Sequence, residues 1–111
     1  MHYAPQTPLA IVDGAELNAE IERALRQGER IAVLTHAVAP VAPDRITWRP
    51  LPAESSRYGR ALYATLRELD RAGASRILVE SVPANEAWAA VADRLGRAAG
   101  AGTDAGLPDA T

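Results

Sequence analysis

The sequence predicts a small α/β fold with an open, mostly parallel sheet of about four strands and helices on both faces. Short, continuously apolar segments occur at residues 9–12, 31–35 and 77–79, as is typical of strands buried on both sides of a parallel sheet. Between and after them, apolar residues recur at helical spacing. The order strand, helix, strand, strand, helix, strand, helix is the alternation of α/β domains. At 111 residues, the chain has the length of one domain.

The chain is expected to enter this fold through an extended segment. Pro5 and Pro8 disfavour helix in the residues before them, so residues 1–8 read as a lead-in. The apolar run at 9–12 is the first strand candidate.

The first helix is predicted over residues 15–27. Asp13 and Gly14 end the preceding strand and could cap this helix, and Gly28 lies where a C-cap glycine belongs. The residues predicted to share its inner face are Leu17, Ile21, Ala24 and Leu25.

Two strands are expected to follow without a helix between them. Residues 31–35 form the second strand, and the proline-containing loop 36–45 leads to a weaker third strand at 46–49, which Pro50 ends. The loop is too short for a parallel crossover with its own helix, so the direction of the third strand stays open.

A long helix over 57–72 comes next, with Ser55 or Ser56 as its cap and Gly73 as its end. Its inner face is predicted to carry Tyr58, Ala61, Leu62, Leu66 and Leu69.

The fourth strand is predicted at 77–79 and the last helix after Asn85, a good cap. Trp88, Val91, Leu95 and Ala98 share one face of that helix. Residues 100–111 lack periodicity and are expected to form a disordered tail.

Composition excludes several function classes. A net charge of −2 gives no electrostatic footprint for direct nucleic-acid binding. All basic residues are arginine, which excludes Schiff-base chemistry and a phosphate-loop lysine, and without cysteine no thiolate metal site exists. No apolar run approaches the ~20 residues of a membrane span. With no signal peptide visible, the default expectation is a cytoplasmic protein that does not bind membranes.

The search for catalytic or metal-binding groups finds no constellation. His2 and His36 lack any metal-ligand spacing, so we assign neither catalytic nor metal-ligating residues. A ligand crevice is conceivable where parallel strands end. The residues that could line it are Asp13, Gly14, Thr35, His36, Glu80 and Ser81. The alternative is that they are ordinary turn and capping residues.

Surface groups give little further signal. Arg67, Asp70 and Arg71 read as solvated charges near a helix end. Trp48 on the weak third strand marks an interface, such as that of a homo-oligomer, unless it packs in the core or at the sheet edge.

Two segments of the chain resemble a known family. His2-Tyr3-Ala4-Pro5, followed by the apolar run at Leu9, resembles the segment that joins the two domains of L-threonylcarbamoyladenylate synthases (threonylcarbamoyl-AMP synthases). A longer stretch is similar to the signature of their C-terminal domain: Leu51-Pro52-Ala53, Tyr58, residues 60–70, Gly73, residues 76–80 and residues 88–95.

The resemblance implies a Rossmann-like accessory domain at 9–99, preceded by a remnant of the interdomain linker at 1–8. It also implies that His2, Tyr3 and Pro5 help to close the active site of a YrdC-type catalytic domain. That domain binds ATP, threonine and bicarbonate, with Mg²⁺ expected, and its product serves threonylcarbamoyl modification of adenosine in tRNA. This chain needs no cofactor of its own in this view.

The functional prediction is therefore an accessory domain that docks on a catalytic domain, in cis or in trans, and is not active alone. The chain has no room for that domain before His2, so it is a fragment, a stand-alone remnant or half of a split enzyme. The alternatives are an independent small-molecule or nucleotide-binding regulatory module, a structural or oligomerising unit and, last, an autonomous enzyme.

Overall fold

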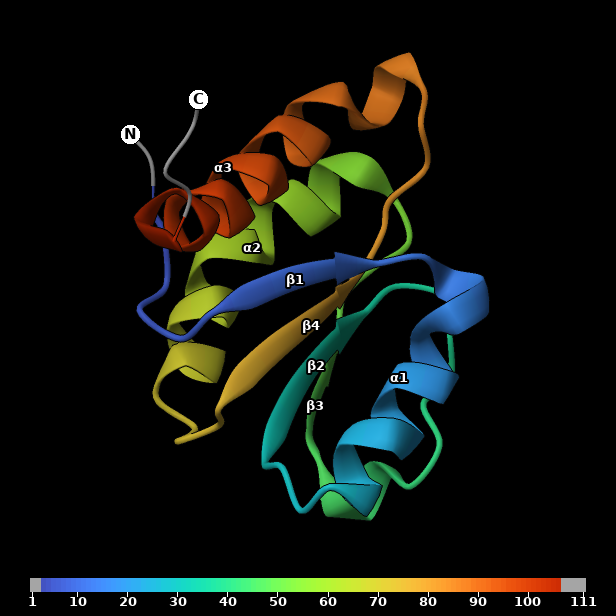
Figure 1. Ribbon diagram of the computed structural model, residues 1–111. Coiled ribbons are helices and arrows are strands. Elements are labelled where there is room, and N and C mark those ends of the chain that lie inside the picture. The colour runs from blue at the N-terminus through green and yellow to red at the C-terminus, as the bar shows by residue number, and fades with distance from the viewer. Residues whose placement is uncertain (1–2, 107–111) are drawn as a thin grey trace.

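The computed structural model describes residues 3–106, and strands and helices follow one another in the predicted order (Figure 1). The elements are β1 (Leu9–Val12), α1 (Gly14–Arg26), β2 (Ile31–Thr35), the 3₁₀ turn η1 (Pro43–Arg45), β3 (Thr47–Pro50), α2 (Ser55–Asp70), β4 (Arg76–Glu80), the 3₁₀ turn η2 (Glu86–Trp88) and α3 (Ala89–Gly106). The predicted α/β class is thus confirmed.

The four strands form one parallel sheet in the order β1-β4-β2-β3. Strand β4 lies between β1 and β2, with Leu9 opposite Ile77 and Ile31 opposite Arg76. Every strand therefore ends at the same edge of the sheet. The chain passes over β4 between β1 and β2, using α1 as the crossover, as parallel pairing requires.

Strand β3, whose direction the sequence left open, is parallel to β2. The turn η1 takes the place of a crossover helix, and the Leu51 N–H donates to the Thr35 carbonyl oxygen at 2.8 Å. The strand extends one residue further than predicted, because Pro50 lies inside it. Proline is tolerated here because β3 is an edge strand.

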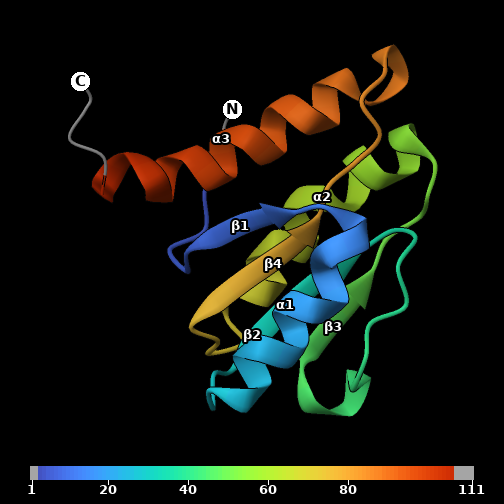
Figure 2. The ribbon, with the colours of Figure 1, turned by 45° about the vertical axis from the view of Figure 1, so that its right-hand side comes forward.

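The sheet carries one helix on one face and two on the other (Figures 1 and 2). On the α1 side, side chains of α1 pack against Ile31, Val33 and Leu78. On the opposite side, α2 and α3 cover residues that alternate with these along the strands, such as Leu34 and Val79. Because β2 and β4 are covered on both faces, they read as continuous apolar runs rather than alternating ones.

The inner faces of the helices agree with the predicted ones. Tyr58, Leu62, Leu66 and Leu69 of α2 are buried, as are Trp88, Val91, Leu95 and Ala98 at and after η2. The cap of α2 differs from the prediction. Glu54 is the N-cap and its carboxylate accepts from the Ser56 and Arg57 N–H groups, so the helix begins at Ser55. A carboxylate one residue earlier reaches the same free N–H groups as a serine hydroxyl.

Two further helix ends follow from the sequence. Asn85 caps the 3₁₀ turn η2, from which α3 continues, by accepting from the Trp88 N–H at 3.2 Å. Gly28 and Gly73 have φ of +76° and +77°, which only glycine adopts without strain, and they follow α1 and α2.

The last helix, α3, continues to Gly106, beyond the predicted end at Ala99. Once a helix is nucleated, each added residue gains one backbone hydrogen bond, and the helix continues in spite of the glycines at positions 100, 102 and 106. Residues 107–111 of the predicted tail lie outside the described residues. None of the helices in the described range combines the length and apolar character needed to span a membrane.

A pair of isoleucines tests this layered core. Ile21 of α1 is 0% exposed, whereas Ile11 of β1 is 41% exposed. Replacing a buried isoleucine by alanine costs about 2–5 kcal/mol, so Ile21→Ala should lower the free energy of unfolding by that amount. The matched Ile11→Ala should cost less than about 1 kcal/mol. Urea unfolding measures the free energy of unfolding of both variants. Equal losses would contradict the burial of Ile21 between α1 and the sheet.

Candidate functional site

The carboxyl ends of the strands meet around Glu80, the last residue of β4. This glutamate is only 4% exposed. Its Oε1 atom accepts three hydrogen bonds from consecutive backbone N–H groups of the loop after β2, those of His36, Ala37 and Val38, at 2.9, 3.0 and 3.0 Å. A buried charge is costly unless it is hydrogen-bonded, and these three donors meet that requirement.

The hydrogen bonds decide the ionisation state of this carboxylate. Burial acts to raise the pKa of Glu80, but the hydrogen bonds from the three backbone N–H groups outweigh it, and the pKa lies below its ordinary value. Hydrogen bonds to a charged form favour that form. Glu80 is therefore a fixed negative charge at neutral pH.

Aromatic rings cover the carboxylate from the α2 side. The His36 side chain is 8% exposed, and its Nδ1 lies 3.5 Å from Oε1 of Glu80. The His36 ring lies 6.0 Å from the Tyr58 ring and 5.5 Å from the Trp88 ring. Burial, and then the charge of Glu80, raises the pKa of the Tyr58 hydroxyl. Both His36 Nδ1 and the Tyr58 hydroxyl are buried without a hydrogen-bond partner.

The other crevice residues are placed as follows. A side-chain carbon at Gly14 would lie 3.3 Å from Oε2 of Glu80, so Gly14 borders the carboxylate. Thr35 is buried, and its hydroxyl accepts from the Trp48 indole N–H at 2.9 Å. Asp13 precedes α1 and is exposed, without a side-chain capping bond. The Ser81 N–H donates to the carbonyl oxygen of Val12.

Glu80, His36 and Gly14 therefore come together, whereas Asp13 and Ser81 act through their backbones at the ends of neighbouring elements. Trp48 is partly buried against the α1-side core, so it packs at the sheet edge rather than projecting as an isolated surface aromatic.

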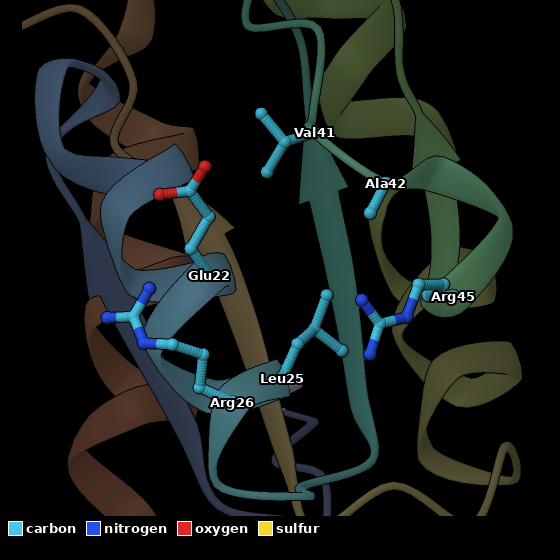
Figure 3. A pocket seen from close by; sticks show the side chains of 6 residues that line it. All are labelled: Glu22, Leu25, Arg26, Val41, Ala42 and Arg45. Atoms are coloured by element: carbon cyan, nitrogen blue, oxygen red, sulfur yellow. The ribbon is translucent and has the colours of Figure 1, made fainter.

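A shallow depression of about 210 Å³ adjoins the crevice. It is lined by Thr35, His36, Ala37, Val38, Ala39, Trp48 and Pro50. Another, of about 390 Å³, lies away from this edge, between the C-terminal part of α1 and the segment before β3 (Figure 3). There the side chains of Leu25 and Arg45 extend toward one another, and the lining is completed by Glu22, Arg26, Val41 and Ala42. Groups of three or more histidine, aspartate or glutamate side chains that could hold a metal do not occur among residues 3–100.

A second organised site lies at the opposite end of the sheet, where the strands begin and the lead-in meets the end of α2. The Asp70 carboxylate accepts four hydrogen bonds: from the Tyr3 hydroxyl at 3.0 Å, the Gln6 N–H at 3.0 Å, and the Thr7 N–H and hydroxyl at 2.9 and 2.7 Å. Burial acts to raise the pKa of Asp70, but the hydrogen bonds outweigh it and the pKa is lowered. Asp70 is thus an anchor for the lead-in, and its interpretation as a solvated surface charge was wrong.

The lead-in also packs against α2, in addition to its hydrogen bonds with Asp70. The Tyr3 ring lies edge-on to that of Tyr63, with 6.2 Å between centroids, and Arg67 lies 5.8 Å from the Tyr3 ring. Burial, together with the bond to Asp70, raises the pKa of the Tyr3 hydroxyl. Pro5 is buried. His2 lies outside the described residues.

One sequence signal could have identified this anchor. Asp70 is the last residue of α2, where the helix dipole disfavours an acidic side chain. Hydrogen-bond donors from another segment can offset this unfavourable interaction with the helix dipole. The sequence alone does not show that Tyr3, Gln6 and Thr7 are those donors.

Comparisons with known proteins agree on one family. The sequence model of the family described as threonylcarbamoyl-AMP synthase, C-terminal domain, matches residues 1–100. The threonylcarbamoyl-AMP synthase of Bacillus subtilis (strain 168) is 31% identical over 103 residues, which is 89% of this chain and 30% of that protein.

Among solved structures, the crystal structure of P. abyssi Sua5 complexed with L-threonine matches with a TM-score of 0.73. The sequence identity is 24%, and the match covers 91% of this chain and 30% of that chain. At this identity the likeness supports the fold. In both comparisons the chain spans less than a third of the longer relative.

The charge of Glu80 can be tested through pH. Glu80→Gln removes charge-assisted hydrogen bonds and should lower the free energy of unfolding by about 1.5–3 kcal/mol at pH 7. Because the folded-state pKa is lowered, the charge stabilises the fold above the unfolded value of about 4.3, and this contribution is lost as the pH falls through the folded-state pKa. The difference between wild type and Glu80→Gln should therefore shrink at pH 3.

Urea unfolding at the two pH values measures this difference. The exposed Glu22 provides the control, since Glu22→Gln should change little at either pH. A gap for Glu80→Gln that is equally large at pH 3 and pH 7 would contradict the assigned charge.

Proposed function

Because the chain belongs to the family of threonylcarbamoyl-AMP synthase C-terminal domains, we propose that it is an accessory domain that docks on the catalytic domain of such a synthase, closes its active site, and is not catalytic alone. The proposed partner, attached in cis or supplied in trans, makes threonylcarbamoyl-AMP from threonine, bicarbonate and ATP for tRNA modification in the cytoplasm. Mg²⁺ would accompany ATP there. The carboxylates of residues 3–100 do not fit a magnesium site, because they are dispersed.

The four hydrogen bonds of Asp70 carry this proposal. They fix residues 3–7, part of the proposed interdomain linker, to the end of α2. A flexible linker loses conformational freedom each time it closes over a site. When its C-terminal part is already ordered, less freedom remains to be lost. The domain would thus favour closure by holding one end of the lid in place.

The position of Tyr3 suggests which surface meets the catalytic domain. Tyr3, the first described residue of the proposed linker, packs against Tyr63 and Arg67 of α2. Four exposed arginines follow one another along the outer side of α2 and at its C-cap, and none of them belongs to an ion pair found within residues 3–100: Arg57, Arg60, Arg67 and Arg71. We therefore place an acidic face of the catalytic domain against this stripe.

A nucleotide-binding regulatory module has less support. The crevice that would hold its ligand contains the Glu80 carboxylate, which repels phosphate. The depression that adjoins this crevice is shallow and open to solvent. Adenylate transfer needs a preorganised cationic pocket from which water is excluded. The crevice of this chain carries a buried carboxylate instead, and this difference supports an accessory role.

A chimera tests the role of the anchor. The C-terminal domain of the Bacillus subtilis synthase is replaced by this chain, and threonine- and bicarbonate-dependent release of pyrophosphate from ATP is measured. The chimera should turn over ATP several-fold faster than the bare catalytic domain, and the chain alone should release none. Asp70→Asn should remove most of the gain, because the linker loses its ionic acceptor, whereas Asp93→Asn on the exposed face of α3 should not. A chimera no faster than the bare domain would refute the proposal.

The arginine stripe is tested in the same chimera. Arg60→Glu should slow pyrophosphate release and make the molecule more extended in small-angle X-ray scattering, since it reverses a docking charge. Arg26→Glu, on the exposed side of α1, is the matched control. Equal behaviour of the two variants would show that the catalytic domain docks elsewhere.

A further inference from the structure

The crevice around Glu80 lies where open α/β sheets usually bind their ligands. Such sites form outside the carboxyl ends of strands, at the point where the following connections turn to opposite faces. Here α1 follows β1 on one face, whereas the chain after the adjacent β4 leads to α3 on the other (Figure 2). Glu80 ends β4 at this point.

The surroundings of the carboxylate are those of an anion site. Three consecutive N–H groups, those of residues 36–38, converge on Oε1. Successive backbone N–H groups in a turn form concave sites that bind anions. On the other side, Oε2 faces Gly14, the first residue of α1, and the N-terminus of a helix also favours negative charge. The absence of a side chain at Gly14 leaves room for the oxygen.

An independent observation on the His36 side chain points to the same oxygen. His36 Nδ1 is buried, has no hydrogen-bond partner, and lies 3.5 Å from Oε1 of Glu80. At that distance the ring nitrogen faces the carboxylate without bonding to it. A buried polar atom without a partner calls for an explanation. Here it adds a fourth nitrogen directed at the same oxyanion.

We infer that the crevice is an oxyanion site that the protein fills with its own Glu80 side chain, so that removal of this carboxylate leaves a site for a small free oxyanion. The class of ligand is a monocarboxylate or inorganic phosphate. In the native chain, Glu80 acts as an internal ligand that holds the loop after β2 closed and keeps nucleotides out. This inference does not depend on the proposed accessory function, because it concerns the isolated domain.

Chemical rescue tests the inference. Glu80→Ala deletes a CH₂ group and a carboxylate, which are the heavy atoms of acetate. The melting temperature of Glu80→Ala should be lower than that of wild type and should rise by several degrees as sodium acetate is added, saturating in the millimolar range. Sodium chloride at equal ionic strength should not reproduce the rise. Inorganic phosphate is the second probe, and a saturable rise with either anion supports the site.

Two controls isolate the site. Wild type retains its own carboxylate, and Glu80→Gln fills the space with a neutral amide, so neither should respond to acetate beyond the chloride baseline. Should Glu80→Ala not fold in chloride, cooperative unfolding restored by acetate or phosphate is the expected result. If neither anion stabilises Glu80→Ala more than it stabilises Glu80→Gln, or if neither restores folding, the inference is overturned.

Discussion

A buried carboxylate, held by three backbone N–H groups, organises the edge at which all four strands end. Strand β4 lies between β1 and β2, so its last side chain, Glu80, reaches both the loop after β2 and the start of α1. That loop has no crossover helix to fix it. The hydrogen bonds to Glu80 supply the constraint, so β3 can return in parallel register and Trp48 can reach the Thr35 hydroxyl.

A second carboxylate, Asp70, orders another segment at the opposite end of the sheet. Asp70 stands where a helix end disfavours negative charge, and it is stabilised there by donors from a segment more than sixty residues earlier in the chain. In both sites the physical constraint is the same: a partly or fully desolvated carboxylate must collect hydrogen-bond donors. The donors it collects belong to a segment without regular secondary structure, which these hydrogen bonds help to order.

These two constraints shape the two ends of the sheet. One closes the crevice where an independent binding module would hold a nucleotide, and the other presents an ordered lead-in beside an arginine-lined helix. The chain covers 30% of the length of its Bacillus subtilis relative.

The sequence by itself determined the α/β class, the order of elements and the inner faces of the helices, because apolar periodicity and glycine punctuation are local properties. It also placed Glu80, His36 and Gly14 near one edge, because parallel strands end together. Only the tertiary structure decided the direction of β3, the cap at Glu54 and the partners of Glu80 and Asp70. The partners of Glu80 and Asp70 are distant in the chain, and the cap at Glu54 depends on which of several adjacent polar groups reaches a free N–H. The sequence does not show whether a given carboxylate is hydrogen-bonded to water or to the protein backbone.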